Sequence, residues 1–297
     1  MRDIRRYSQR TVDIYDAVLE EFEAYCGPAP ESLTVTQIRN YEVHLLDERG
    51  LDARTVGMHL SVLSGWCRYL LGEGVLASNP ARLVPRPKQD KRLPQFYREE
   101  AMEHYFDSTK GVMEFGSYDA ALRHVIITLL SGCGLRRAEL IGLNVNSFDA
   151  SRRVLHVLGK GDKMREIPLV DAVYQEILLY LQLASSLKDY DSSPQAPLLQ
   201  TAKGRRLYPV LVDRAVKKEL GGVEGISGRK SPHVLRHTLA TGLLSEGADL
   251  NSIKELLGHS SLAATQVYTH NSIERLKSVY NNAHPRAKNE GNHGDQS

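Results

Sequence analysis

A proline-rich basic segment constrains this chain more than any other feature of its sequence. Between Asn79 and Pro94 the prolines are interleaved with cationic side chains, in the order Pro80, Arg82, Pro85, Arg86, Pro87, Lys88, Lys91, Arg92 and Pro94. Proline lacks a backbone N–H and fixes φ, so such a run is incompatible with a helix interior or a central strand. We therefore predict an extended basic linker over residues 85–96, which divides the chain into two parts.

The length of the chain agrees with this division. Its 297 residues exceed a typical single domain, and each part can bury its own core. We expect an N-terminal domain over residues 1–84 and a second domain over residues 97–284. Residues 285–297 are rich in Asn, Gly and charge, which is typical of a disordered tail.

Apolar periodicity predicts helices in the first part. Apolar residues recur every three or four positions over residues 11–26, and Gly27-Pro28 ends that helix. A second helix over residues 36–49 has Thr34 and Gln37 at the spacing of a capping box. A third helix is expected over residues 52–71. Its apolar side carries Leu60, Leu63, Trp66, Cys67 and Leu70, while Arg54, Thr55, His59, Ser61 and Arg68 lie largely elsewhere.

The second part is predicted to be mainly helical with one β-hairpin. Short β-rich runs over residues 153–158 and 165–169 flank a turn that contains Gly159, Lys160 and Gly161. Further helices are expected over residues 171–184, 208–220, 232–246, 250–257, 262–268 and 272–281.

Composition excludes several classes of protein. The formal charge is only +2, from 38 Lys+Arg and 36 Asp+Glu, so a polyanionic partner would need local clustering of cations. The three cysteines form no Cys-x-x-Cys pair, which argues against a disulfide framework or a zinc site and favours a reducing cytoplasm. The sequence has no apolar stretch of the kind that is typical of a signal peptide or a membrane span.

Two motifs place arginines where helices begin. Arg136 follows the Gly132-Cys133-Gly134 turn, and Arg236 lies three residues after His233 on one helical face. Fixed cations of this kind stabilise the charge that gathers on the non-bridging oxygens of a phosphodiester during phosphoryl transfer. The structural alternatives are an ion pair of Arg136 with Glu139, and a capped surface helix with Ser231 as the cap and Pro232 at its first position.

Three more residues complete a plausible phosphoryl-transfer set. Lys160, at the hairpin tip, has the reach to protonate a departing oxygen, although turn lysines are usually just solvated. His259 is a candidate hydrogen-bond donor to the phosphate, while Gly258 before it resembles the C-cap of a helix. Tyr268 is a candidate nucleophile, which needs nearby cations or a base because its ordinary pKa is about 10.

The order and spacing of these six residues resemble the tyrosine recombinase (phage integrase) family over nearly the whole chain. Within that family the chain is most similar to the Xer recombinases. The similarity rests on the Gly159-Lys160-Gly161-Asp162-Lys163 hairpin, the run Ser231-Pro232-His233-Val234-Leu235-Arg236-His237, and the ending Tyr280-Asn281-Asn282-Ala283-His284-Pro285-Arg286-Ala287. The resemblance implies a mainly α fold. A SAM-like four-helix core-binding domain and a mostly helical catalytic domain with a small β-hairpin or sheet would form a C-shaped DNA clamp.

The resemblance also implies roles for the six residues. Tyr268 would attack the phosphate to give a 3′-phosphotyrosyl link, while Arg136 and Arg236 bind the non-bridging oxygens with help from His259. Lys160 would protonate the leaving 5′ oxygen, and His233 would accept the tyrosine proton. Because the covalent intermediate conserves the bond energy, no ATP, metal or other cofactor is expected.

Implied partners are double-stranded DNA and other recombinase protomers. Four protomers, identical or of two kinds, would assemble on two DNA sites and exchange the helix expected over residues 272–281; a septal DNA translocase is a further candidate partner. The implied location is cytoplasmic and nucleoid-associated. Candidate DNA contacts are Arg54, Thr55, His59 and Arg68 on the third helix and Lys88 and Arg92 in the linker. The alternatives are a solvated helix face and a linker that is basic for solubility.

The expected function is site-specific recombination that resolves chromosome dimers. An integrase or invertase of a mobile element shares the same chemistry and remains an alternative. A type IB topoisomerase shares it as well, and a DNA-binding protein without catalysis is the alternative from another class.

Overall fold

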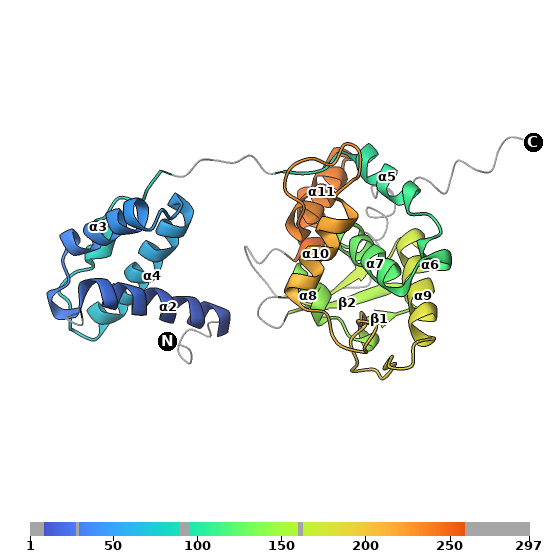
Figure 1. Ribbon diagram of the computed structural model, residues 1–297, viewed down its shortest axis with the longest axis horizontal. Helices are drawn as coiled ribbons and strands as arrows, with labels where there is room; N and C mark the ends of the chain where they lie inside the picture. Colours follow the sequence, from blue (N-terminus) through green and yellow to red (C-terminus); the bar gives the residue numbers. More distant parts are fainter. Residues whose placement is uncertain (1–8, 28–29, 89–94, 160–162, 259–297) are drawn as a thin grey trace, which may run out of the picture. The chain divides into compact units, whose positions relative to one another are not determined.

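The fold is known from a computed structural model that describes residues 9–27, 30–88, 95–159 and 163–258 (Figure 1). The chain divides into two compact units, Met1–Arg92 and Leu93–Ser297. Three of the six candidate catalytic residues, Lys160, His259 and Tyr268, lie outside the described residues, as do Arg92 and the helices expected over residues 262–268 and 272–281.

The described part of the first unit is helical. Its elements are α2 (Gln9–Cys26), η1 (Pro30–Ser32), α3 (Val35–Val43), the π-helical turn η2 (His44–Glu48), α4 (Ala53–Gly72) and η3 (Pro80–Arg82). The predicted capping box at the start of α3 is confirmed, since the Thr34 side chain accepts from Gln37 N and the Gln37 side chain accepts from Thr34 N. The expected single helix over residues 36–49 is instead α3 followed by the π-helical turn η2.

The core of the first unit lies between α2, α3 and α4. Phe22 and Tyr41 meet edge-to-face with their ring centroids 4.9 Å apart, and both side chains are buried. The apolar side of α4 that was expected from the sequence is confirmed, with Leu63 and Cys67 fully buried. These contacts between helices remote in sequence, rather than helix propensity, hold the bundle together.

One residue on the expected polar side of the third predicted helix is buried instead of exposed. His59 is only 5% exposed, and its Nδ1 lies 3.1 Å from the hydroxyl of Tyr41. Burial lowers the pKa of this imidazole, which keeps it neutral in the core. The interpretation of His59 as a DNA contact is therefore wrong, whereas Arg54 and Arg68 are exposed.

In the second unit, helices surround a small sheet (Figure 1). Its helices are α5 (Glu99–Ser108), α6 (Val112–Phe115), α7 (Tyr118–Gly132), α8 (Arg137–Gly142), η4 (Val145–Ser147), α9 (Asp171–Ser185), α10 (Pro209–Glu219), α11 (Pro232–Ser245) and α12 (Leu250–Leu257). Its strands are β1 (Phe148–Asp149), β2 (Val154–Leu158) and β3 (Met164–Pro168). No described helix is both long and apolar enough to cross a membrane.

The sheet is antiparallel in the order β1-β2-β3. The predicted hairpin is confirmed, with Leu155 opposite Ile167 and Val157 opposite Arg165. Strand β1 was not expected, because two residues carry no readable alternation. The pairing puts Arg165 on the same face of β3 as the buried Ile167, and so it faces the core.

Helix α7 is the centre of the second unit. It packs against α9, α10 and α11, and most of its side chains from Ala121 to Leu130 are buried (Figure 1). Ser117 caps its N-terminus by accepting from Ala120 N. At its other end the chain turns through Cys133 and Gly134 into α8, which brings Arg136 beside α11 and α12.

Candidate active site

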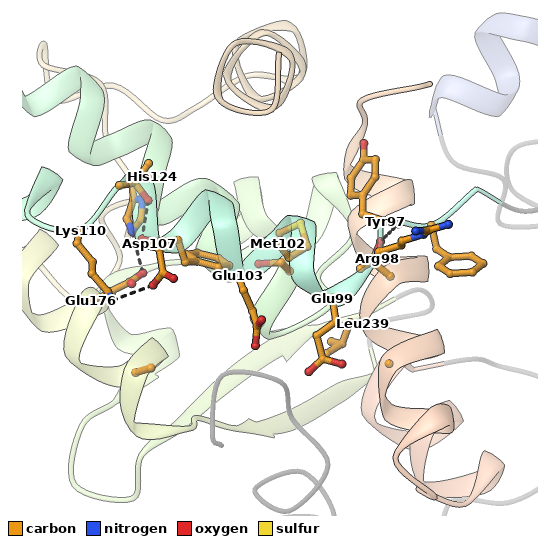
Figure 2. Close-up of a pocket in the computed structure, with 18 of the residues that line it drawn as sticks. Tyr97, Arg98, Glu99, Met102, Glu103, Asp107, Lys110, His124, Glu176 and Leu239 are labelled. Atoms are coloured by element: carbon orange, nitrogen blue, oxygen red, sulfur yellow. Dashed lines mark hydrogen bonds and ion pairs between the residues drawn. The ribbon is translucent and has the colours of Figure 1, made fainter. Parts of the chain in front are cut away.

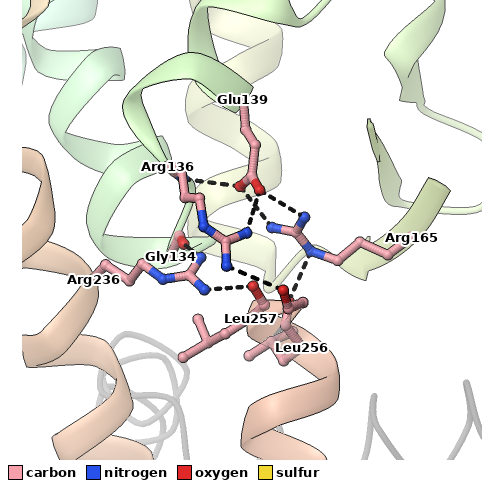
Figure 3. A network of polar contacts seen from close by, with 8 residues as sticks. Gly134, Arg136, Glu139, Arg165, Arg236, Leu256 and Leu257 are labelled. Atoms are coloured by element: carbon pink, nitrogen blue, oxygen red, sulfur yellow. Dashed lines mark hydrogen bonds and ion pairs between the residues drawn. The ribbon is translucent and has the colours of Figure 1, made fainter. Parts of the chain in front are cut away.

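Four elements of the second unit converge around Arg136 and Arg236. The N-terminus of α8, strand β3, the first turns of α11 and the C-terminus of α12 supply the side chains and carbonyls of one polar network (Figure 3). Gly134 permits this convergence: its φ is +60°, and an added Cβ would stand 2.6 Å from Leu257 Cδ2. Glycine is thus needed here both for its backbone conformation and for close packing.

Arg136 is held by the first turn of its own helix and by α12. It occupies the N-cap of α8, where its backbone N donates to Glu139 Oε2 at 2.9 Å. Its guanidinium donates to Glu139 Oε1 at 2.6 Å and to the carbonyl of Gly258 at 3.1 Å. The ion pair considered as a structural alternative is therefore confirmed. It leaves part of the guanidinium accessible, since the Arg136 side chain is 33% exposed.

Arg236 is more deeply buried, at 7% exposure. Its guanidinium donates to the carbonyl of Gly134 and to that of Leu257. Burial lowers the pKa of Arg236 to about 10, and the nearby Arg136 contributes to the lowering. The side chain is still cationic at neutral pH.

The C-terminal end of α12 gathers three arginines. We call the carbonyls of Leu256, Leu257 and Gly258 the helix-end carbonyls. Arg165 donates to the first, Arg236 to the second and Arg136 to the third. The C-terminus of a helix leaves carbonyls without intrahelical partners and carries partial negative charge, which suits cationic donors. The helix stop expected at Gly258 is confirmed by its left-handed conformation, with φ at +65°.

Among the residues that the structure describes, Glu139 is the only carboxylate in this network. Burial alone would raise its pKa, but the hydrogen bonds and charge of Arg165, together with bonds from Arg136, outweigh burial and lower it. Glu139 is therefore an anion between two arginines. Arg136, Arg165 and Arg236, which we call the arginine cluster, carry three positive charges against this one negative charge. The excess of two positive charges favours binding of an anion at the accessible edge of Arg136.

His233 lies in the first turn of α11, one helical turn before Arg236. The His233 residue is exposed at the surface, but partial desolvation lowers its pKa, and the charges of Arg137, His237, Arg229 and Arg236 lower it further. A neutral imidazole at neutral pH can accept a proton. Ser231 and Pro232 occupy the N-cap and first positions as expected, but among the described residues the Ser231 hydroxyl is buried without a hydrogen-bond partner.

The site contains groups that the sequence motifs did not reveal. Arg165 was not among the candidates, although it stands in an inward position of the predicted strand, where a charged side chain implies a buried partner. The helix-end carbonyls were missed as well, since a backbone group has no signature in the sequence. Of the six candidates, the structure brings Arg136, His233 and Arg236 together.

Comparison with known proteins decides the family. Residues 100–275 match the model of the phage integrase family. The chain belongs to that family. It is 38% identical over 286 residues to the tyrosine recombinase XerC of Alcanivorax borkumensis, covering 96% of this chain and 91% of that protein. It is 35% identical over 310 residues to XerC of Chlorobaculum parvum, covering 95% and 91%.

A solved structure has the same fold. The XerH site-specific recombinase bound to palindromic difH substrate, in a post-cleavage complex, superposes with a TM-score of 0.70 at 21% identity, over 92% of this chain and 80% of that one. The predicted family and the mostly helical fold with its small sheet are thus confirmed. The protein is an Xer-type tyrosine recombinase, a member of a family that cleaves and rejoins DNA strands.

Proposed function

We propose that this recombinase resolves chromosome dimers by acting at specific sites in double-stranded DNA. The observation that carries the strand-cleavage part of the proposal is the arginine cluster, in which Arg136 and Arg236 are fixed on one helix end and carry more positive charge than Glu139 neutralises. Such a fixed pair suits the two non-bridging oxygens of a scissile phosphate, whose charge grows in the transition state. The XerC relatives and the DNA-bound XerH support DNA as the substrate.

In the proposed reaction, the hydroxyl oxygen of Tyr268 attacks the phosphorus while the bond from phosphorus to the 5′ oxygen breaks. The tyrosine proton passes to His233, whose lowered pKa keeps it neutral and able to accept. Lys160 gives a proton to the departing 5′ oxygen, and His259 donates a hydrogen bond to the phosphate. Attack by a 5′-hydroxyl from the partner strand reverses these steps and rejoins the DNA.

Assembly of several protomers is part of the proposal, and a cavity of about 510 Å³ in the second unit supports it (Figure 2). Apolar side chains such as Met102 and Leu239 line it. The lining also has two cations, Arg98 and Lys110, of which Lys110 pairs with Asp107, and it has more carboxylates than cations: Glu99, Glu103, Asp107, Glu114 and Glu176. The helix expected over residues 272–281 has the complementary pattern, with Ile273, Leu276 and Tyr280 spaced for one face and Arg275 and Lys277 beside them. We propose that a neighbouring protomer inserts this segment here.

Cleavage of a nicked suicide substrate tests the proposed chemistry. A nick beside the scissile phosphate lets the short cleaved fragment diffuse away, so the covalent adduct accumulates and can be counted on a denaturing gel. The wild type should form the adduct, Tyr268→Phe should not, and Arg136→Ala should form it about 100-fold more slowly, as expected when one stabiliser of the developing charge is lost. Adduct formation at the wild-type rate by Arg136→Ala would refute the assigned role.

The biological assignment needs a separate measurement. Crosslinking the protein to DNA in cells and sequencing the bound fragments should give a chromosomal site that flanks no mobile element. Bound sites that flank a mobile element, or an invertible promoter, would instead favour the integrase or invertase alternative.

A further inference from the structure

Arg165 is the member of the arginine cluster that the proposed reaction does not use. It lies on β3 with its side chain 5% exposed. Its Nη1 and Nη2 donate to the two oxygens of Glu139 at 3.1 and 2.8 Å, and its Nε donates to the carbonyl of Leu256 at 3.0 Å (Figure 3). Every guanidinium nitrogen is engaged within the protein, so Arg165 is built to hold other groups rather than a ligand.

The first group that Arg165 holds is the carboxylate that orients Arg136. Glu139 bonds both the backbone N and the guanidinium of Arg136, so its position fixes that of Arg136. The bidentate contact with Arg165 sets the plane of the carboxylate and shares its negative charge. If Arg165 were absent, the whole charge of Glu139 would fall on Arg136 and weaken its attraction for a phosphate.

The second group is the end of α12. Arg165 ties β3 to the first helix-end carbonyl, and the next two carbonyls bind Arg236 and Arg136. Gly258 packs directly on Arg165, because an added Cβ there would lie 3.2 Å from Arg165 Cδ. The guanidinium therefore fixes the platform on which the two proposed phosphate ligands rest.

We propose that Arg165 is a positioning residue for DNA strand cleavage, which acts through Glu139 and the Leu256 carbonyl to aim Arg136 at the scissile phosphate. This inference rests on the proposed role of Arg136. It assigns to Arg165 no contact with DNA, so loss of Arg165 should slow the chemical step without weakening DNA binding to the same degree.

The chain offers a control pair whose carboxylate, Glu166, lies on the same strand as Arg165. Arg152 makes a bidentate ion pair with Glu166 at 2.8 and 2.9 Å, and Glu166 follows Arg165 directly but points to the other face of the sheet. Arg152→Met thus removes an Arg–Glu pair of the same geometry away from the cluster. For Arg165→Met we expect cleavage of the suicide substrate at saturating DNA to slow on the order of 10- to 100-fold, as for misplaced catalytic groups. Arg152→Met should cleave at the wild-type rate.

A double variant separates positioning from mere support of the fold. Arg165→Met leaves Glu139 buried with one partner fewer, and the resulting loss of stability could itself slow cleavage. Glu139→Gln combined with Arg165→Met removes both charges, so its melting temperature should return towards the wild-type value while its cleavage stays slow. Recovery of cleavage together with stability would show that the pair serves the fold alone, and would overturn the proposal.

Epistasis with Arg136 gives the closing test. If Arg165 acts through Arg136, Arg165→Met should slow cleavage far less in an Arg136→Ala background than in the wild type. The inference would be refuted if the rate reductions of the two single variants multiplied in the double variant. It would also be refuted if a folded Arg165→Met protein cleaved like the wild type. The Arg136→Ala variant alone separately tests the proposed function: if it cleaves normally, the role of Arg136 fails whatever Arg165 does.

Discussion

Replacing Arg236 by lysine tests whether the arginine cluster controls the charge of its own members. Arg236 spans two carbonyls with its planar fork, and it lies where burial and Arg136 lower its pKa to about 10. Lysine keeps a positive charge but offers three donors from one nitrogen atom. It cannot serve two carbonyls and a phosphate oxygen in the same geometry.

The surroundings of Arg236 predict the pH at which the lysine loses its charge. An ordinary lysine has a pKa of about 10.4, about 2 below that of arginine. The same burial and neighbouring charge should lower the pKa of the lysine in Arg236→Lys from its ordinary value towards the neutral range. Arg236→Lys should therefore lose its cation at a lower pH than an ordinary lysine does, whereas the wild-type guanidinium stays charged.

Single-turnover cleavage of the suicide substrate measures this effect. The rate of Arg236→Lys is divided by the wild-type rate at each pH from about 6 to 9, which cancels the titration of the nucleophile common to both proteins. We expect a ratio of about 10⁻² or below at low pH from the lost fork, since one stabilising donor is worth about 10²- to 10³-fold. The ratio should then decline further as pH rises across this range, because the lysine loses its proton while the arginine keeps its charge.

A ratio that stays constant across this range would refute the reasoning. It would mean that the buried cations do not perturb one another, or that the lysine relaxes away from the cluster. Melting temperatures recorded at each pH show whether the variant is folded. Only rates measured well below the melting temperature enter the comparison.

Three further predictions follow from the site. Gly134→Ala should lower the free energy of unfolding by about 1–3 kcal/mol in a urea titration, because alanine is strained at positive φ and its Cβ would meet Leu257; an unchanged midpoint would contradict this. The folded protein lowers the pKa of Glu139, so this carboxylate stabilises the fold above its ordinary pKa of 4.5, and the contribution is lost as pH falls through the lower pKa of the folded state. Glu139→Gln should therefore reduce the loss of unfolding free energy between about pH 5 and 3. An identical pH dependence in the variant and the wild type would exclude this contribution. Arg137→Gln should raise the pKa of His233, because the charge of Arg137 lowers it, and should move the acidic side of the pH–rate profile for cleavage to higher pH. An unchanged pH–rate profile would argue against His233 as the proton acceptor.

Local signals in the sequence accounted for much of the fold. The capping box at Thr34 and Gln37 and the glycine stop at Gly258 depend on neighbours within a few residues, and the structure confirms both. The hairpin of β2 and β3 was equally readable, because β-rich runs on either side of glycines are a local feature of the sequence. The order of motifs along the chain was enough to indicate the family.

Features that depend on distant partners were not readable. His59 occupies a polar side of its helix by periodicity, yet Tyr41, 18 residues earlier, accommodates it in the core. Arg165 and Glu139 are 26 residues apart and meet only because β3, α8 and α12 converge. Ser231 has the residue type and position of a cap, but its hydroxyl makes no such bond among the described residues. In each case the three-dimensional neighbour, not the local pattern, decides the role.

The most direct test of the central claim is to identify the residue that becomes linked to DNA. The adduct trapped on a suicide substrate can be digested with protease and nuclease, and the peptide that carries the nucleotide sequenced by mass spectrometry. We predict a single modified peptide in which Tyr268 bears a 3′-linked phosphate. A link to another residue, or a link to a 5′ phosphate, would contradict the proposed site and its chemistry.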